Sequence, residues 1–570
     1  NAPCFFRVNR LYFARFPNLS RRQMLQSIEY KEIPAESGGF SNLFVDYISA
    51  YDRVAKYYNG NFRDPSHLKQ VIEQVGRKPK DRSTLVRVLS EQNREFHCSI
   101  KTLANIDLLH EDNTFAIVTG QQVGLLTGPL YTLYKIITVL KLTDRLNGSF
   151  PEYHFVPIFW LEGEDHDFEE VNNVKLVGHD NQPKKIEYLV DGKPLDKNIG
   201  AVGDLQLDEY IDAFFKQAQE TLINTEFKEK LFETVRHFYQ RGTTFSKAFV
   251  GLINHFFEDS GLIFINPNNK DLKRLMSPIF QREINEHPKV CQLVIDRSAE
   301  LEQRYHAQIK AKAINLFLFE KGGRYLIEPR EDGFGLKGTR RHLTLEELRQ
   351  IAGETPELLS PNVVLRPICQ DTVLPTAVYV GGPNEIAYFA QLRPVYDFFD
   401  LVMPTLYPRV SATILEEKLE GILQKFELEL TDFFGNLETI LRTVSDQISE
   451  IKVDDLFQSV GARMKESLNE LKFGINQIDP TLLGALETAA SKIDFQLNVL
   501  KEKTINAQKK KNEIALRQVE KVANNIVPFG ELQERQINVI YLMNKYGLDF
   551  VKWLKEEVRI DLFKHQVIRL

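Results

Sequence analysis

An acidic run that contains one histidine is the part of the sequence whose residue types most directly suggest chemistry. The apolar segment "VPIFWL" leads into "EGEDHDFEE", which places Glu164, Asp165, His166 and Asp167 side by side. Neighbouring carboxylates raise one another's pKa and stabilise the charged form of a histidine, and these conditions tune acid–base groups. We therefore predict that these four residues are catalytic.

The acidic run also has two other interpretations. Its acids would suit a solvated helix start, where negative charge complements the helix dipole. Asp and His are reasonable ligands for a divalent ion, but the adjacent residues Asp165, His166 and Asp167 match no recognised ligand spacing. We expect no structural metal, and we keep a metal-dependent hydrolase built on the GEDHD run as an alternative function.

A glycine loop in "FAIVTGQQVGLLTGPLYTLYK" is the second candidate site. The four-residue spacing of its glycines would also fit a packing stripe on one continuous helix. Pro129 favours a strand, a loop and a helix, because proline disfavours helical angles in the residue before it and fits the first helical turn. Such a loop lets the backbone approach a ligand, and helix N–H groups bind anions. We expect ligand binding by Thr119, Gly120, Gln121, Gln122, Gly124, Thr127, Gly128 and Lys135.

A third loop, in "AVYVGGPNEIAYF", repeats this pattern of strand, glycines and helix start. A plain tight turn is equally compatible with its double glycine. Arginines occur before and after it, in "SPNVVLRPICQD" and "PTLYPRVSATILE", and the planar guanidinium suits carboxylates or phosphates by two-point contact. Either arginine could instead be an ordinary ion-pair partner. The candidate binding residues here are Gly381, Gly382, Glu385, Asn362, Arg366 and Arg409.

The elements that must position these loops alternate between short apolar runs and helical patterns over residues 113–410. This alternation predicts a largely parallel sheet covered by helices. Ligands bind beyond the carboxyl ends of the strands in such sheets, where we expect the three loops to meet. Two insertions, at about 175–260 and 300–350, interrupt the core. The second insertion contains the charged, hairpin-like sequence "EKGGRYLIEPREDGFGL", which suggests a peripheral position.

The regions on either side of this core differ from it. Residues 1–112 read as mostly helical and pack on the core. Residues 411–528 carry long amphipathic stripes, such as Leu430 to Ile451 and Leu486 to Val522, which predict an antiparallel coiled-coil arm or, alternatively, a compact helical bundle. Arms of about 45 residues would extend roughly 65 Å. Residues 529–570 are expected to return to the core.

Composition narrows the class of protein. The chain has 570 residues, a net charge of -6 and 43% hydrophobic residues, which are ordinary values for a globular protein of several domains. The charge argues against nucleic acid as a partner. The first residues, "NAPCFFRVNRLYFARF", lack the apolar region of a signal peptide, and no stretch is long enough to span a membrane. Four cysteines without a CxxC pair favour a reducing cytoplasm.

Six segments together closely resemble the bacillithiol biosynthesis cysteine-adding enzyme family, and the likeness runs from about residue 5 to the C-terminus. Three are the loops described above, and the others are "LSPNVVLRPICQD", "PTLYPRVSATILE" and "LQERQINVIYLMNKYG". The resemblance implies a Rossmann-like core with connecting-peptide insertions, distantly similar to class I aminoacyl-tRNA synthetases, and a coiled-coil arm that forms a homodimer. It also implies a cytoplasmic ligase that performs the last step of bacillithiol assembly, the addition of cysteine to glucosaminyl malate.

This activity would give the candidate residues specific roles. Joining the cysteine carboxyl to a sugar amine is uphill in water, so the carboxyl must be activated, and we expect ATP, with Mg²⁺ if phosphates meet the acidic loop. Arg366, Arg409 or Lys135 could receive the malate carboxylates, and His166 or a neighbouring acid could act as general base. Asp165 or Asp167 could hold the amino group of cysteine. A non-catalytic assembly protein that acts through its arm is the remaining alternative.

Overall fold

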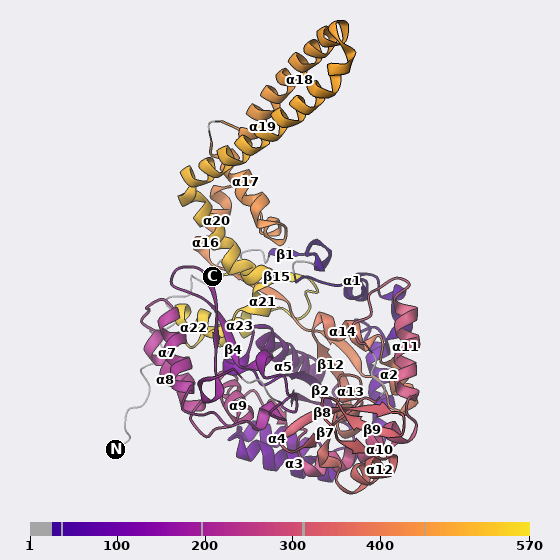
Figure 1. Cartoon of the computed structure of the whole chain (residues 1–570). Helices are drawn as coiled ribbons and strands as arrows, with labels where there is room; N and C mark the ends of the chain where they lie inside the picture. Colours follow the sequence, from indigo (N-terminus) through magenta and orange to yellow (C-terminus); the bar gives the residue numbers. More distant parts are fainter. Residues whose placement is uncertain (1–25, 36–37, 195–197, 311–313, 450) are drawn as a thin grey trace, which may run out of the picture. The chain divides into compact units, whose positions relative to one another are not determined.

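The computed structural model describes residues 26–35, 38–194, 198–310, 314–449 and 451–570 (Figure 1). These residues form two compact units, one of residues 26–414 and 528–568 and one of residues 415–527 and 569–570. The expectation about a signal peptide concerns residues 1–25 and lies outside the described residues. Among the described helices, none has the length and apolar character needed to cross a membrane.

A five-stranded parallel sheet lies at the centre of the first unit and confirms the predicted α/β fold. All side chains of its third-longest strand β12 are buried, and β2 and β3 are each buried except at one end. Nearly continuous apolar strands of this kind are typical of a parallel sheet with both faces covered. The strand order is β13 (Thr405–Pro408), β12 (Thr376–Gly381), β2 (Thr114–Gln121), β3 (His154–Leu161) and β6 (Ile263–Ile265).

The first glycine loop is a strand, a loop and a helix, as predicted. Strand β2 ends at Gln121, a 3-10 turn follows at Leu125–Thr127, and α5 (Tyr131–Ser149) packs back along β2 and β3. The backbone takes positive φ at Leu126, Thr127 and Gly128, with values of 50°, 78° and 70°. Glycine adopts this region freely, whereas the two preceding residues need support from their surroundings to remain there.

Helices from the N-terminal part of the sequence pack against the sheet. Those that precede β2 contact β12, β6 and β3 and are α2 (Pro65–Gly76), α3 (Arg82–Glu95) and α4 (Ile100–Leu108). Asp64, Asp81 and Ser99 cap their first turns, which is why these helices begin there. The remaining short elements of the first unit's ends are β1 (Gln26–Ile28), α1 (Asn42–Ser49), α21 (Gln533–Gln536), α22 (Val539–Tyr546), α23 (Phe550–Glu557) and β15 (His565–Arg569).

The insertion between β3 and β6 combines a hairpin with helices. It contains α6 (Phe168–Val171), β4 (Asn173–Val177), β5 (Pro183–Glu187), α7 (Ile211–Thr221), α8 (Lys228–Phe238) and α9 (Phe245–Phe256). Strands β4 and β5 pair antiparallel.

The insertion between β6 and β12 carries an antiparallel sheet in the order β10–β9–β8–β7–β11. Its strands are β7 (Leu316–Glu320), β8 (Gly323–Arg330), β9 (Gly333–Leu336), β10 (His342–Leu343) and β11 (Leu359–Pro361). Its helices are α10 (Lys270–Asn285), α11 (Lys289–Leu301), α12 (Leu345–Glu354) and α13 (Arg366–Val373). After β12, the chain continues through α14 (Pro383–Phe389) and α15 (Arg393–Phe398) to β13.

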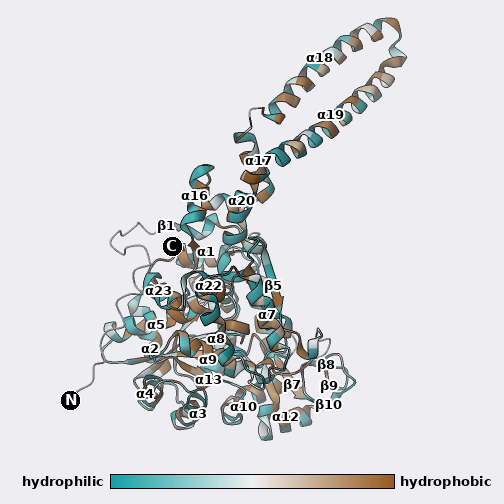
Figure 2. Cartoon of the chain, turned by 90° about the vertical axis from the view of Figure 1, so that its left-hand side faces the viewer, coloured by the Kyte–Doolittle hydropathy of each residue, from teal (hydrophilic) through white to brown (hydrophobic). Residues whose placement is uncertain are grey.

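The second unit contains the predicted antiparallel arm, but the arm is shorter than expected. It consists of α18 (Val453–Ile478) and α19 (Leu483–Lys511), which run side by side and are joined by a turn at Pro480–Leu482 (Figure 1). At 1.5 Å per residue these helices are about 39 and 44 Å long. Polar and apolar residues alternate along both helices (Figure 2).

The stripe Leu430 to Ile451 lies outside the arm. Its residues form a 3-10 turn at Leu430–Phe434 and helix α17 (Leu437–Gln447). Helix α20 (Glu513–Ile526) packs on α17 and also on α16 (Glu417–Lys425). Asn512 separates α19 from α20, and its side chain donates hydrogen bonds to Ser445 and Ser449 of the neighbouring segment. This break, together with buried residues such as Val444 and Val522, makes a compact bundle at the base of the arm.

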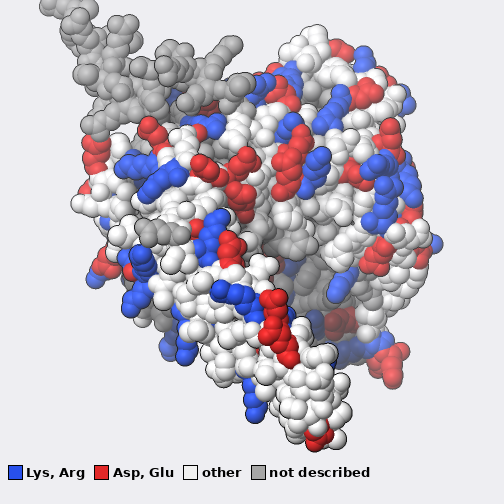
Figure 3. Space-filling view, turned by 90° about the horizontal axis from the view of Figure 1, so that it is seen from above, with Lys and Arg blue, Asp and Glu red and all other residues white. Residues whose placement is uncertain are grey.

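Charges of both signs are interspersed over the face shown in Figure 3. Among the described residues visible there, Lys and Arg form no continuous field. A concentrated basic surface is the usual electrostatic requirement for binding a nucleic-acid backbone.

Candidate functional site

A cavity of about 720 Å³ opens at the carboxyl ends of the parallel strands. Four neighbouring strands each contribute the residue that directly follows them: Gln122 after β2, Glu162 after β3, Gly382 after β12 and Arg409 after β13. Carboxyl ends of parallel strands meet at one edge of the sheet, so the topology alone brings these distant residues together. The volume is within the range of small-molecule sites.

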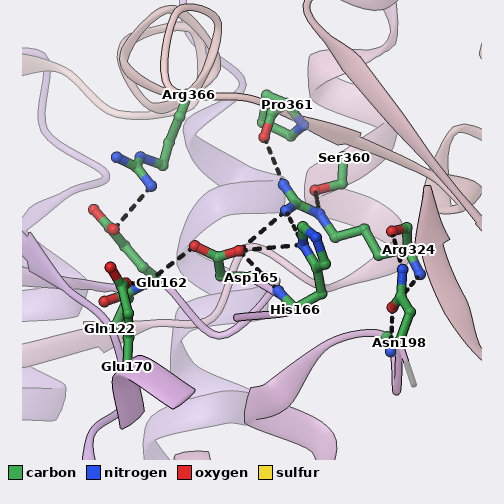
Figure 4. Close-up of polar contacts among 11 residues, drawn as sticks. Gln122, Glu162, Asp165, His166, Glu170, Asn198, Arg324, Ser360, Pro361 and Arg366 are labelled. Carbon is green, nitrogen blue, oxygen red and sulfur yellow. Dashed lines mark hydrogen bonds and ion pairs between the residues drawn. The ribbon is translucent and has the colours of Figure 1, made fainter. Parts of the chain in front are cut away.

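Asp165, His166 and Arg324 form a polar cluster in the wall of this cavity (Figure 4). An Asp165 oxygen accepts hydrogen bonds from the Arg324 guanidinium at 3.3 Å and from the backbone N–H of His166 at 2.8 Å. Its other oxygen accepts from the side chain of Gln122 at 3.0 Å. Burial opposes ionisation of Asp165, but these hydrogen bonds and the charge of Arg324 hold its pKa well below the usual range. Asp165 is therefore an ionised carboxylate near neutral pH.

Arg324 is fixed by several partners besides Asp165. Its Nε donates to Ser360 and its Nη2 donates to the carbonyl of Pro361, both at 3.0 Å. Its Nη1 lies 3.2 Å from Nδ1 of His166. A guanidinium only donates, so in this arrangement Nδ1 of His166 accepts.

Two other acids of the run are paired with cations. Glu162 forms an ion pair with Arg366 at 2.8 Å, and burial raises the pKa of Glu162 against the opposing charges of Arg366 and Lys135. Glu164 forms an ion pair with the fully buried Lys273 of α10. Among the residues that the structure describes, no group of three or more His, Cys, Asp and Glu side chains is arranged as a metal site.

Lys135 joins the first loop to the third by an ion pair, and Arg409, after β13, is paired with the C-terminal segment. Nζ of Lys135 contacts Glu385 at 2.6 Å and donates to the carbonyl of Gly120 at 2.7 Å and to Gln121 at 2.9 Å. Arg409 pairs with Glu534 at 2.8 Å. Burial opposes ionisation of Glu385 and Glu534, yet the adjacent Lys135 and Arg409 lower the pKa of each carboxyl. Both pairs are thus ionised contacts that hold the loops in place.

The structure brings most of the predicted site residues to this cavity. Those in its wall are Glu164, Asp165, His166, Gln121, Gln122, Lys135, Asn362, Arg366, Gly382, Glu385 and Arg409. Asp167 does not line it and is exposed at the start of α6. Asn362 lies in the wall, and its side-chain oxygen also accepts from the N–H groups of Val364 and Leu365 in the turn that precedes α13.

The other predicted residues of the glycine loops lie behind the cavity wall. Gly124 and Gly128 line an adjacent cavity of about 290 Å³ and approach each other so closely that a Cβ on Gly124 would lie 3.2 Å from the Gly128 Cα. The N–H of Leu130, at the start of α5, donates to the carbonyl of Ile537 and is thus already bonded. Thr119 donates to the Val380 carbonyl at 2.8 Å. The remaining members of this group are Gly120, Thr127 and Gly381.

Several residues of the site were not predicted from the sequence. The sequence around Arg324 suggests a peripheral insertion. This prediction is wrong for the Arg324 side chain, because strand β8 places it in the cavity wall. Sequence spacing offers no signal for it, since its partners Asp165 and Pro361 belong to other segments. Glu162 is the first acid of the run, and its residue type alone does not distinguish it from the acids that follow. Tyr131, Trp160, Tyr388 and Arg535 also line the cavity.

A parallel sheet with a polar cavity beyond its carboxyl edge defines the chain as a Rossmann-like α/β protein with an added helical arm. Comparison with family models matches residues 26–410 to "Bacillithiol biosynthesis BshC, N-terminal Rossmann-like domain" and residues 412–570 to "Bacillithiol biosynthesis BshC, C-terminal coiled-coil domain". The chain therefore belongs to the BshC family of bacillithiol biosynthesis, which confirms the resemblance seen in the sequence.

Curated relatives match nearly the whole chain. A protein of Salinibacter ruber named "Putative cysteine ligase BshC" is 39% identical over 94% of this chain and 97% of its own length. Proteins of the same name from Chloroherpeton thalassium and a Geobacillus species are 35% and 32% identical, over 95% and 90% of this chain and over 99% and 95% of their own lengths. These names are consistent with a ligase.

Proposed function

We propose that this chain joins the carboxyl group of cysteine to the amine of glucosaminyl malate, with activation of the carboxyl by ATP. The observation that carries the proposal is the cavity at the strand ends, where Asp165, His166 and Glu162 meet in a chain whose relatives are named cysteine ligases. The cavity has the volume for a small substrate and supplies ionised and acid–base groups, both of which amide formation needs.

His166 is the proposed base that removes a proton from the acceptor amine. For Nε2 to accept this proton, the ring must carry its other hydrogen on Nδ1, where Asp165 Oδ1 lies 3.4 Å away. In this tautomer Nδ1 donates and can no longer accept from Arg324, so the 3.2 Å contact between them must open while Nε and Nη2 of Arg324 stay bound to Ser360 and Pro361. Asp165 would thus orient the imidazole and stabilise its charged form as the bond forms.

The support for ATP is chemical. Amide formation must remove an oxygen from the cysteine carboxyl, and a phosphoryl or adenylyl group turns this oxygen into a leaving group. The cations that line the main cavity, such as Lys135 and Arg366, are already paired with carboxylates. A triphosphate in this cavity would therefore need Mg²⁺ to offset the acidic groups, and a separate nucleotide pocket is the other arrangement compatible with the proposal.

A direct assay tests the proposed reaction. The purified chain is incubated with cysteine, glucosaminyl malate and ATP or another nucleotide, and products are followed by mass spectrometry. We expect a product with the mass of the two substrates minus water, together with AMP and pyrophosphate or ADP and phosphate. Product formation without nucleotide would contradict activation by ATP, and absence of product with every nucleotide would contradict the ligase proposal.

We also propose that the arm forms a homodimer and that the protein acts in the cytoplasm. Large apolar side chains of the arm are exposed in the single chain, with exposed fractions of 71% for Phe473, 64% for Phe495 and 83% for Ile478. A second copy would remove this surface from water. The cysteines of the described residues are free thiols, which suits a reducing compartment.

A further inference from the structure

Most cations in the wall of the main cavity are already neutralised. Each lies at ion-pair distance from one carboxylate, and a charge neutralised in this way attracts a further anion weakly. The pairs are Lys135 with Glu385 at 2.6 Å, Arg366 with Glu162 at 2.8 Å, Arg409 with Glu534 at 2.8 Å and Arg324 with Asp165 at 3.3 Å. Three of these cations, Lys135, Arg366 and Arg409, were the expected receivers of substrate carboxylates.

Arg535 differs from these cations. Its Nη2 donates one hydrogen bond, to the carbonyl of Gly39 at 3.0 Å, and no carboxylate of the described residues lies at ion-pair distance from its guanidinium. The two acids nearest in sequence are engaged elsewhere, Glu534 with Arg409 and Glu531 with Gln536. Its remaining donors are therefore available to a ligand.

The position of Arg535 suits a ligand that enters the cavity. Its side chain lines both the main cavity and the adjacent smaller cavity. Gln122 and Tyr131 also line both cavities, so these three residues form part of the wall between them. Burial lowers the pKa of Arg535 and the charge of Arg409 adds to this effect, against the opposing charges of Glu534 and Glu531; an anion in contact with the guanidinium would stabilise its charged form further. The hydroxyl of Tyr131 accepts from Gln121 at 3.3 Å, which leaves its own hydrogen for a second contact.

We propose that Arg535 binds a carboxylate of the acceptor substrate and thereby selects acceptors that carry one. This inference rests on the proposed function, in which the malate part of glucosaminyl malate provides the carboxylates. A guanidinium binds a carboxylate through two parallel N–H···O bonds, which gives both affinity and orientation. Lys310 also lines the cavity without an ion pair among the described residues, but it is exposed, and solvent screens its charge.

Calorimetric titration tests this assignment independently of catalysis. Wild type, Arg535→Gln, Arg535→Lys and Lys552→Gln are titrated with glucosaminyl malate and with methyl glucosaminide, which has the same sugar amine without the carboxylates. Lys552 is an exposed cation in the same C-terminal segment and lines neither cavity, so Lys552→Gln is the charge-matched control. Thermal unfolding of each variant verifies that it is folded.

The expected result is at least a tenfold weaker binding of glucosaminyl malate by Arg535→Gln, a smaller loss with Arg535→Lys and none with Lys552→Gln. Methyl glucosaminide should bind wild type and Arg535→Gln equally. Equal binding of glucosaminyl malate by folded Arg535→Gln and wild type would overturn the inference. If binding depends on Arg535 but no product forms in the ligation assay, the inference stands and the proposed reaction fails; if wild type does not bind glucosaminyl malate, both fail.

Discussion

At the scale of single residues, the acidic run divides into side chains that face the cavity and one that does not. Asp165 and His166 are tied to each other and to Arg324, whereas the adjacent Asp167 is exposed to solvent. Two aspartates that look equivalent in the sequence therefore have different surroundings. Their chemistry follows from these surroundings, because only Asp165 can orient the imidazole.

We predict that His166→Ala and Asp165→Asn each lower kcat about 100-fold or more, the usual contribution of general acid–base catalysis. Asp167→Asn should cost less than about tenfold, because its side chain does not reach the cavity. Initial rates of product formation measure these effects, and circular dichroism verifies folding. An Asp167→Asn variant as impaired as Asp165→Asn would show that the exposed acid takes part in the reaction.

At the scale of elements, the glycine loop depends on the C-terminal segment. The side chain of Asn538, at the start of α22, donates to the carbonyl oxygens of Leu126 and Gly128 at 2.9 and 2.7 Å. These are positions of positive φ, and the carbonyls would otherwise be buried without donors. A residue far along the chain thus holds the backbone that leads from β2 to α5.

We predict that Asn538→Ala destabilises the first unit by about 2 to 4 kcal/mol, because two buried carbonyls lose their donors. Asn538→Asp keeps the oxygen that accepts from the Ile540 N–H but loses both donated bonds, so it should be destabilised to a similar degree. The temperature of unfolding provides the measurement. An Asn538→Asp variant as stable as wild type would mean that the helix cap, and not the loop contact, is what matters.

The arm is an element whose contribution concerns assembly. We predict that Phe473→Glu combined with Phe495→Glu converts a dimer into a folded monomer, since both side chains are exposed in the single chain and charges there would oppose association. Light scattering at micromolar concentration should give twice 65.9 kDa for wild type and 65.9 kDa for the double variant. A monomeric wild type would contradict the dimer proposal.

At the scale of the whole molecule, one buried acid links stability to pH. Oε1 of Glu283 on α10 accepts two hydrogen bonds from Asn315, at 2.9 and 3.0 Å, while Oε2 has no partner among the described residues. Burial raises the pKa of Glu283 to about 7, against the hydrogen bonds from Asn315 that lower it. The folded state therefore binds the proton of the Glu283 carboxyl more tightly than the unfolded chain, in which the pKa of this carboxyl is near 4.5. This contribution to stability is complete below about pH 4.5 and is lost as the pH rises through about 7.

We predict that Glu283→Gln flattens this dependence. Between pH 5 and 8, wild type should lose on the order of 2 kcal/mol of stability that the variant retains. Any cost of the new amide is the same at both pH values and cancels in the comparison. Apparent Tm values of both proteins at pH 5 and 8 provide the test, and equal pH slopes would show that Glu283 does not titrate in this range.

Local patterns in the sequence were sufficient for the elements and for three of the loops that meet in the cavity. Apolar runs that end in glycine or acidic residues predict strands, Pro129 marks the helix after the first loop, and parallel strands present their ends at one edge. The predicted arm is longer than the observed one, because the apolar stripe from Leu486 to Val522 continues past the end of α19 at Lys511. The helix ends there although the stripe does not, and the side chain of the next residue, Asn512, donates a hydrogen bond to Ser449.

Only the tertiary structure decided how the charges are paired. Spacing left open whether Arg366 and Arg409 bind anions or pair with acids. In the structure these two and Lys135 each meet a carboxylate from another segment, while Arg535 meets none among the described residues. Arg324 reaches the cavity from an insertion whose sequence gives no indication of a role in the site. Secondary structure follows from neighbours along the chain, whereas ion pairs follow from distances in space, and a sequence specifies those distances only through the complete fold.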